Sequence, residues 1–407
     1  MSTARFCEPL EPLERRTLLA APVILFVRGA DRSGGFLEAT NDAGRTEQLA
    51  DINNASTTSG NHGWATLAAT LRGAGYVVEQ IKEPLEAGAP ATGQTQGAPI
   101  KFETMNLSRY NAIVFGSNNA KYPTASVDAI TNYIKNGGGA LFISDANFGS
   151  SWRDAPDSDQ AFLTRVGLKV QQDNGVYALT RAGGDFVKPT HPVLFGVDSF
   201  DGEGVSPLVV PATPPAGVRI ERIVGARTKT RDNNGMTASN KFQGTLRNVT
   251  ASDAALVFAT TGKGRVAGFF DRNTFFNAGG AGTNINRFNN KQLALNLFRW
   301  VSDRSAPNAI VQSYRPTTRE IKMTFDDNLY GSLVRGDITL KNRTTGALIP
   351  NDRWTFTLSE APQRTYITIK ISTAQPAGGY QFEIGGNKIN DDSWNVRTTP
   401  IRFDFAI

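Results

Sequence analysis

Residues 110–144 read YNAIVFGSNNAKYPTASVDAITNYIKNGGGALFIS. This stretch holds two short apolar runs, Ala112–Phe115 and Ala140–Ile143, separated by a segment whose apolar residues recur at helical spacing over Ser126–Lys135. Three glycines at 137–139 follow that segment directly and predict the end of the helix. A strand, a helix and a second strand in this order predict a parallel pair joined by a crossover helix.

The same alternation extends in both directions, from residue 23 to residue 305. Further strands are expected at Pro22–Gly29, Tyr76–Ile81, Leu107–Ser117 (around the run already quoted), Leu168–Gln171, Arg219–Gly225, Ala254–Thr260 and Arg265–Phe270. Further helices are expected at His62–Gly75, Asp157–Val166 and Asn290–Val301. Buried strands that alternate with helices are typical of α/β folds, so we expect a doubly wound, mostly parallel sheet with helices on both faces.

The pattern changes after residue 305 to strict alternation of apolar and polar residues. Six such strands are expected, at Ile321–Phe325, Ile338–Leu340, Trp354–Leu358, Ile367–Ile371, Tyr380–Ile384 and Ile401–Phe405. Short alternating strands separated by turn residues predict an all-β sandwich. The chain is therefore expected to divide into an amino-terminal segment 1–22, an α/β domain 23–305 and a β-sandwich 306–407.

Composition restricts the chemistry that 407 residues can carry out. The single cysteine, Cys7, excludes an internal disulfide and a cysteine-ligated metal site, and the two histidines, His62 and His191, leave little room for a histidine-rich centre. The net charge of +6 is spread without a basic run, so no nucleic-acid partner is expected. No apolar stretch is long enough to cross a bilayer. No cofactor is expected, apart from a possible calcium ion discussed below.

The first 22 residues do not resemble the start of a folded domain. Arg15 and Arg16 precede a short run of small and apolar residues, as in a secretory leader. We favour the interpretation in which Pro22 separates this leader from a first strand at Val23–Val27. In a second interpretation the apolar part of the leader continues through Val27. In a third, the first 22 residues are a disordered tail and not a leader. The segment Leu10–Leu19 is similar to the LEPR-XLL motif of exported bacterial proteins, which implies export, although Leu13 and Glu14 interrupt the motif.

Residues 23–303 resemble class I glutamine amidotransferase-like domains of the trehalose-utilisation type. The resemblance is carried by residues 110–115, 130–134 and 137–143, by THPVLFGV at 190–197, and by residues 264–268 followed by 290–300. Catalytic members of that class place a cysteine nucleophile on a sharp turn after a strand, with a histidine and a glutamate downstream. Here that turn holds Ser144 and Asp145 and no cysteine, so glutamine hydrolysis is not expected.

Residues 307–407 resemble SbsA-type bacterial Ig-like domains. The similarity is carried by the opening strand, which ends REIKMTFDDNL, and by the closing segments Pro376–Ile384 and Asp391–Asn395. The sequence departs from the family at Ser393 and Trp394, where a small residue and glycine are usual. The resemblance implies a spacer or adhesion module on an exported protein.

Polar residues cluster where the expected parallel strands end, and ligands of doubly wound sheets bind at that edge. The candidate ligand-binding residues are Arg28, Asp31, His62, Ser117, Asn118, Ser144, Asp145, Asn147, Asp271 and Asn273. Their oxygen-rich side chains suit a sugar or a hard cation such as calcium. The alternative is that these groups are solvated or form turns. We expect Ser144 to bond local backbone, and His62 and His191 to pack.

Two functions follow from these residues. The first is an exported, non-catalytic binding or structural protein that recognises an extracellular or cell-surface ligand, such as a carbohydrate or another surface component, with the Ig-like module as spacer or adhesion element. The alternative is a sugar-directed hydrolase in which Asp145 or Asp271 acts with Asp31 as carboxylate acid and base.

Two further motifs have structural interpretations. We interpret Asp154, Asp157 and Asp159 as acidic residues at a helix start, and Gly262–Gly264 as a hairpin turn.

Overall fold

The computed structural model describes most of the chain after residue 20. The described residues are 21–30, 32–33, 46–47, 50–55, 63–85, 87–88, 97–116, 118, 120–144, 155–170, 176–203, 205–226, 253–277 and 283–407. The segment expected to be an export leader, including Cys7, lies outside them.

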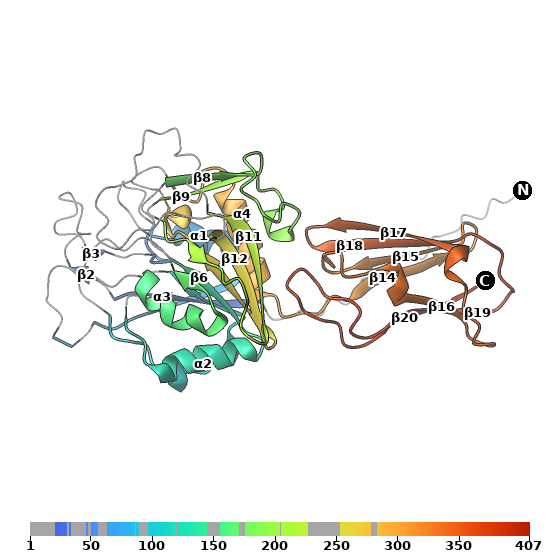
Figure 1. Ribbon diagram of the computed structural model, residues 1–407, viewed down its shortest axis with the longest axis horizontal. Helices are drawn as coiled ribbons and strands as arrows, with labels where there is room; N and C mark the ends of the chain where they lie inside the picture. The colour runs from blue at the N-terminus through green and yellow to red at the C-terminus, as the bar shows by residue number, and fades with distance from the viewer. Residues whose placement is uncertain are drawn as a thin grey trace, which may run out of the picture.

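A nine-stranded sheet forms the larger part of the molecule (Figure 1). Its parallel strands lie in the order β4 (Val77–Lys82), β1 (Val23–Arg28), β5 (Ala112–Phe115), β6 (Gly139–Ile143) and β13 (Gly264–Phe269). The sheet continues antiparallel through β12 (Asp253–Thr261), β10 (Leu208–Val209) and β7 (Lys169–Val170), and β11 (Val218–Gly225) also pairs with β12. The sheet is therefore mixed rather than mostly parallel as predicted, because β12, β10, β7 and β11 extend its parallel half by antiparallel pairing.

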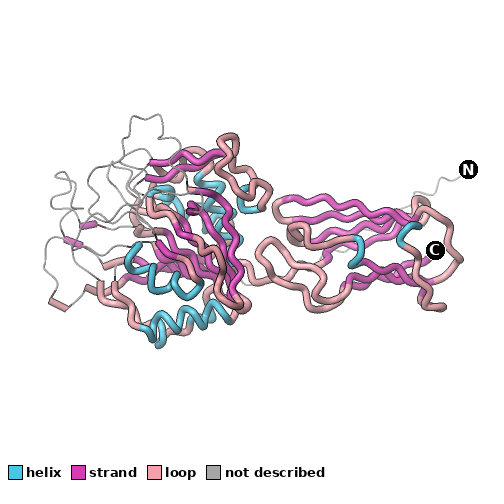
Figure 2. The backbone as a smooth tube through the Cα atoms, viewed as in Figure 1, coloured by secondary structure: helices cyan, strands magenta, loops and turns pink. Residues whose placement is uncertain are grey.

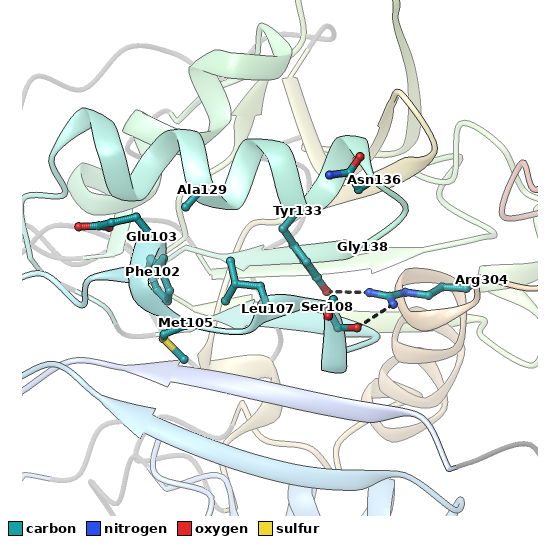
Figure 3. A pocket seen from close by; sticks show the side chains of 10 residues that line it. All are labelled: Phe102, Glu103, Met105, Leu107, Ser108, Ala129, Tyr133, Asn136, Gly138 and Arg304. Carbon is teal, nitrogen blue, oxygen red and sulfur yellow. Dashed lines mark hydrogen bonds between the residues drawn. The ribbon is translucent and has the colours of Figure 1, made fainter.

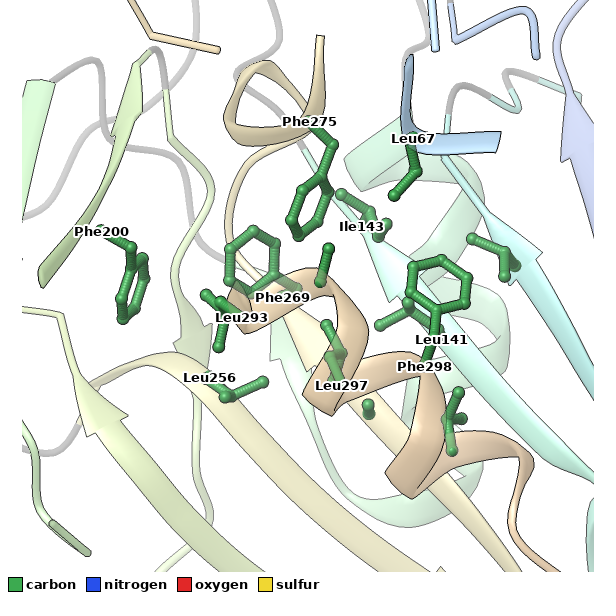
Figure 4. Packing of buried hydrophobic residues seen from close by; sticks show 14 of the residues in the cluster. Leu67, Leu141, Ile143, Phe200, Leu256, Phe269, Phe275, Leu293, Leu297 and Phe298 are labelled. Atoms are coloured by element: carbon green, nitrogen blue, oxygen red, sulfur yellow. The ribbon is translucent and has the colours of Figure 1, made fainter. Parts of the chain in front are cut away.

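Helices cover both faces of this sheet because its central strands are apolar on both sides. Ile24 and Phe26 of β1 pack with α1 (Ala65–Gly73) and α4 (Asn290–Ser302), whereas Leu25 and Val27 pack on the side of α2 (Thr124–Lys135) and α3 (Ala155–Leu163). Figure 4 shows Leu293, Leu297 and Phe298 of α4 directed at the strands. Full burial of each such side chain contributes about 1.5–3 kcal/mol.

Two antiparallel sheets make up the second part of the molecule (Figure 2). One sheet has the order β14 (Ala309–Arg315), β15 (Glu320–Phe325), β18 (Arg364–Ile371) and β17 (Trp354–Ala361); the other has β16 (Ile338–Asn342), β19 (Gly379–Ile384) and β20 (Ile401–Ala406). Their inward residues form one hydrophobic core, as the alternating pattern predicts. The six expected strands are present, and β14 is a seventh that the sequence analysis missed.

Several predicted boundaries differ from the structure. The strand expected over Leu107–Ser117 begins only at Ala112, because Leu107–Arg109 forms a short 3₁₀ helix, and 3₁₀ turns also occur at 102–104, 164–166, 192–194, 273–275, 335–337 and 351–353. A hairpin of β8 (Val176–Thr180) and β9 (Ser199–Glu203) was not predicted. The small pair β2 (Arg32–Ser33) and β3 (Thr46–Glu47) was not predicted either. The turn at Gly262 does join β12 to β13.

The carboxyl end of α4 joins the two parts. Trp300 donates a hydrogen bond from Nε1 to the backbone oxygen of Asp392 at 2.8 Å, and its ring lies 3.6 Å from that of Phe258. Arg299 pairs with the Asp392 carboxylate at 2.6 Å. Since α4 also packs on the large sheet, these contacts fix the β part directly against the α/β part.

Candidate functional site

The parallel strands β1, β5, β6 and β13 bring five of the candidate residues to one edge of the sheet. Arg28 ends β1, Asn118 follows β5, Ser144 follows β6, and Asp271 and Asn273 follow β13. The backbone N–H of Ser144 donates to the oxygen of Phe269 at 3.0 Å, which ties the ends of β6 and β13 together. The other five candidates lie outside the described residues: Asp31, His62, Ser117, Asp145 and Asn147.

Ser144 is the first residue after β6. Its side chain is fully buried, and its hydroxyl donates to Oδ2 of Asp159 at 3.1 Å. Asn118 donates from Nδ2 to Oδ1 of the same carboxylate at 3.0 Å. Asp159 is buried as well, so this carboxylate connects the loops after β5 and β6 to helix α3. The arrangement positions three polar side chains inside the protein rather than presenting Ser144 to a substrate.

Asp271 is also fully buried and bonded to its surroundings. Its carboxylate accepts hydrogen bonds from the backbone N–H groups of Glu203, Asn273 and Thr274, each at 3.0 Å. Burial, with a smaller contribution from the Glu203 carboxylate, raises the pKa of Asp271 to about 8, although these hydrogen bonds oppose the shift. Asn273 beside it is only partly buried and remains accessible to a ligand.

Arg28 is 4% exposed and therefore contributes little surface to this edge. Its Nη2 lies 3.7 Å from Oδ2 of Asp51, and the Oδ1 of Asp51 accepts from Gln80 at 3.0 Å. Asp51 thus connects the end of β1 to the neighbouring edge strand β4. Arg28 acts in the described structure as a buried ion-pair partner.

His191 packs in the interior, as the sequence analysis expects. Its side chain is fully buried, Nδ1 accepts from the backbone N–H of Val193 at 3.1 Å, and the ring contacts Phe258 and Tyr330. Burial, with smaller contributions from Arg299 and other cations, lowers the pKa of His191 to about 3. A neutral histidine between the two parts of the molecule is a packing residue.

The described carboxylates best arranged for a metal ion lie away from the strand ends. Asp303, Asp327 and Asp391 place one oxygen each within 4.8 Å of one another, where the two parts of the molecule meet. Burial and the neighbouring Asp392 raise the pKa of Asp327 to about 8, and burial with Asp303 and Asp327 raises the pKa of Asp391 to about 9. Oxygen ligands at this spacing would suit a hard cation.

Raising the pH from 6.5 to 8 is expected to destabilise the folded chain. Asp271, Asp327 and Asp391 have folded pKa values of about 8, 8 and 9 and lose their protons near 3.8 when unfolded, so the folded chain binds more protons in this window. Stability is therefore lost as the pH rises, by on the order of 2 kcal/mol for each group that titrates independently, since each group can contribute about 1.4 kcal/mol per pH unit. The measurement is the free energy of unfolding in urea.

His191 does not contribute to this loss of stability. Because its pKa is lowered on folding, it reduces stability only as the pH falls below about 6.5. In the same experiment Asp327→Asn should flatten the dependence, since it removes one of the three titrating groups. An unfolding free energy that rises between pH 6.5 and 8 would contradict the assignment.

Among the described residues, a pocket of about 270 Å³ with both apolar and polar lining lies beside α2 (Figure 3). Phe102, Met105 and Leu107 line it, and Arg304 closes one end, where its guanidinium lies 3.4 Å from the Tyr133 hydroxyl. This pocket is formed by the amino-terminal side of the sheet. None of the candidate residues from the sequence analysis lines it.

Sequence reasoning missed two buried carboxylates at the candidate edge, Asp159 and Glu83. Asp159 shares the helical spacing of Phe162, Leu163 and Val166, which signals an inward position, but it was interpreted as an acidic helix start. Glu83 follows β4 and accepts from the Tyr122 hydroxyl at 2.7 Å. No local pattern distinguishes Glu83 from an exposed loop acid.

No family model matches the chain, and no curated protein matches it. Among solved structures, the chain is similar to a ThuA-like protein from Parabacteroides merdae, with 12% sequence identity and a TM-score of 0.33. That match covers 69% of this chain and 90% of the other. The sheet order and the helices on both faces define this chain as an α/β domain followed by a β domain. Among the described residues, no helix is long and apolar enough to span a membrane.

Proposed function

We propose that this chain is a non-catalytic binding or structural protein that recognises an extracellular or cell-surface ligand. A carbohydrate is the ligand class that we propose for the strand-end edge, because Asn273 is the described candidate there that is only partly buried, and its amide can both donate to and accept from hydroxyls. The proposed larger domain is flavodoxin-like and amidotransferase-like, in keeping with the order of its five parallel strands. The β-sandwich is proposed to be an Ig-like spacer or adhesion module.

The burial of Ser144 is the observation that carries this proposal. A serine nucleophile must reach its substrate and needs a base that accepts its proton. Ser144 is fully buried and donates to Asp159, a carboxylate that also accepts from Asn118. The hydroxyl is therefore committed to a structural network at the position where the resembled class is catalytic.

One observation favours the alternative, a hydrolase. The pKa of Asp271 is raised to about 8 by burial, so this carboxyl holds a proton at neutral pH, as a general acid must. Its proposed partners, Asp31 and Asp145, lie outside the described residues. We rank the hydrolase second because the Asp271 oxygens accept from three backbone N–H groups and have no exposed surface.

The experiment is a glycan array probed with the full chain, followed by affinity and product analysis for each glycan retained. The expected result is retention without cleavage, and Asn273→Ala weakens binding about tenfold through the loss of a hydrogen bond. Asn351→Ala, an exposed asparagine in the β part, is the matched control and should bind as wild type does.

Two results would contradict the proposal. Cleavage of a retained glycan that Asp271→Asn abolishes would establish the hydrolase instead. The absence of any retained glycan would exclude carbohydrate as the ligand. Calcium is varied in a separate arm, because the oxygen-rich strand ends suit that ion.

Export is proposed from the amino-terminal segment alone. Arg15, Arg16 and the apolar residues after them resemble an export signal, and a spacer module suits a surface protein. Amino-terminal sequencing of the secreted or surface fraction tests this directly. Recovery of the chain only from the cell interior, with Met1 intact, would overturn it.

A further inference from the structure

A cavity of about 440 Å³ opens between the two parts of the molecule, at the sheet edge opposite the candidate residues. Pro22, Tyr76 and Asn111 line it just before the first residues of β1, β4 and β5. The remaining lining comes from the end of α4, the linker at 303–305 and two turns of the β part. Figure 1 shows the two parts side by side along this boundary.

The lining of this cavity is polar but nearly balanced in charge. Three carboxylates, Asp303, Asp326 and Asp327, stand against two guanidinium groups, Arg299 and Arg304. Arg299 lies 3.5 Å from the Asp327 carboxylate, so opposite charges offset each other within the lining, which is left without a strong excess of either sign. Asp391, the third carboxylate of the group that would suit a hard cation, does not line this cavity, so the cavity lining itself favours neither a small anion nor a small cation.

The cavity offers both hydrogen-bond donors and acceptors. Arg299 pairs through Nη2 with Asp392 and through Nη1 with Asp327, while its buried Nε has no hydrogen-bond partner in the described structure. Ser305 and Gln363 are exposed side chains on the same wall. A hydroxyl group both donates to carboxylates and accepts from a guanidinium, so it satisfies both kinds of group at once.

The ring of Tyr76 supplies the aromatic part of the wall. Tyr76 is half-buried, packs against the core beneath α4, and shares a hydrogen bond with Ser302 through its hydroxyl. A tyrosine held in this way presents an apolar body beside a polar tip. The flat apolar face of a sugar ring can lie against such a surface while its hydroxyls face the polar groups.

We propose that this interdomain cavity binds a small neutral saccharide of one or two rings, held by Arg299, Asp326, Gln363 and the ring of Tyr76. Cavities of about 300–1,000 Å³ hold small organic ligands, and boundaries between domains are a preferred place for them. The inference goes beyond the proposed function because it names a second site, on the opposite sheet edge, that uses neither Ser144 nor Asn273. Ligand binding here involves both parts of the molecule.

The experiment screens the full chain against free glucose, galactose, mannose, N-acetylglucosamine, maltose and cellobiose by saturation-transfer NMR, with titration calorimetry for each hit. Ser305→Trp fills the cavity without removing a side-chain bond described here, and Ser359→Trp makes the same change on an exposed position of β17. The expected result is that at least one saccharide binds wild type and Ser359→Trp equally, and binds Ser305→Trp at least about tenfold more weakly.

Three outcomes would overturn the inference. No saccharide binds, or saccharide binding survives in Ser305→Trp, or a charged probe such as acetate or Ca²⁺ binds in place of the saccharides and is lost in Ser305→Trp but not in Ser359→Trp. The Asn273→Ala variant separates the two sites in the same titration. Binding lost in Asn273→Ala and kept in Ser305→Trp supports the strand-end edge while overturning the interdomain cavity, and the converse overturns only the strand-end edge.

Discussion

Replacing Gly139 with alanine is expected to destabilise the chain by about 3 kcal/mol or more. Gly139 begins β6, and a Cβ atom there would lie 1.8 Å from the backbone oxygen of Val301 in α4. A backbone oxygen cannot rotate away as a flexible side chain can, so the helix or the strand has to shift. Equilibrium unfolding in urea, followed by circular dichroism, measures the loss.

Gly73→Ala is the matched control for this substitution. Gly73 ends α1, and no heavy atom lies within 4 Å of a Cβ built there. That variant should unfold at the same urea concentration as wild type or slightly higher, because alanine favours the helix. Equal stability of the two variants would show that α4 does not approach β6 as closely as described.

Replacing Trp300 with alanine is expected to cost about 4 kcal/mol. The side chain is fully buried, stacks on Phe258 at 3.6 Å and donates to the Asp392 oxygen, so its removal leaves a cavity and an unpaired carbonyl. The loss should also loosen the β part from the α/β part. Small-angle scattering would report this as a larger radius of gyration for a chain that is still folded.

Trp300→Phe separates these contributions. A phenylalanine ring preserves most of the stacking on Phe258 and removes only the N–H donor, so a loss of about 1–2 kcal/mol is expected. A phenylalanine variant as unstable as the alanine variant would assign the whole effect to the hydrogen bond. An alanine variant as stable as wild type would show that Trp300 does not hold the two parts of the molecule together.

The sequence predicts those strands and helices whose own residues show a clear apolar pattern. The strands β1 and β6 are continuous apolar runs, and those of the sandwich alternate, so both kinds are found at their expected positions. Strand β9 reads SFDGE and contains one large apolar residue, Phe200, so its pairing with β8 leaves no local signal. Strand β14 has the adjacent apolar residues Ile310 and Val311, both exposed, so its sequence lacks the regular alternation of apolar and polar residues.

The sequence predicts where the candidate residues lie on the fold but not how their side chains are packed. The ends of parallel strands place Ser144 and Asp271 at one edge, which follows from the strand pattern alone. Whether each side chain is exposed depends on partners distant in the sequence: Asp159 for Ser144 and the backbone of Glu203 for Asp271. Both side chains are buried by partners that are distant in the sequence, so local residue spacing cannot predict that burial.

Helix α4 also determines how the molecule would bear a mechanical load. A pull on the β part enters the α/β part through the last turn of α4, where Arg299 and Trp300 hold Asp392. The helix lies along the sheet with Leu293, Leu297 and Phe298 buried, so force acts on it as shear against the strands (Figure 4). Rupture would therefore require a core helix to slide along its sheet, so the buried side chains of α4 oppose the tension.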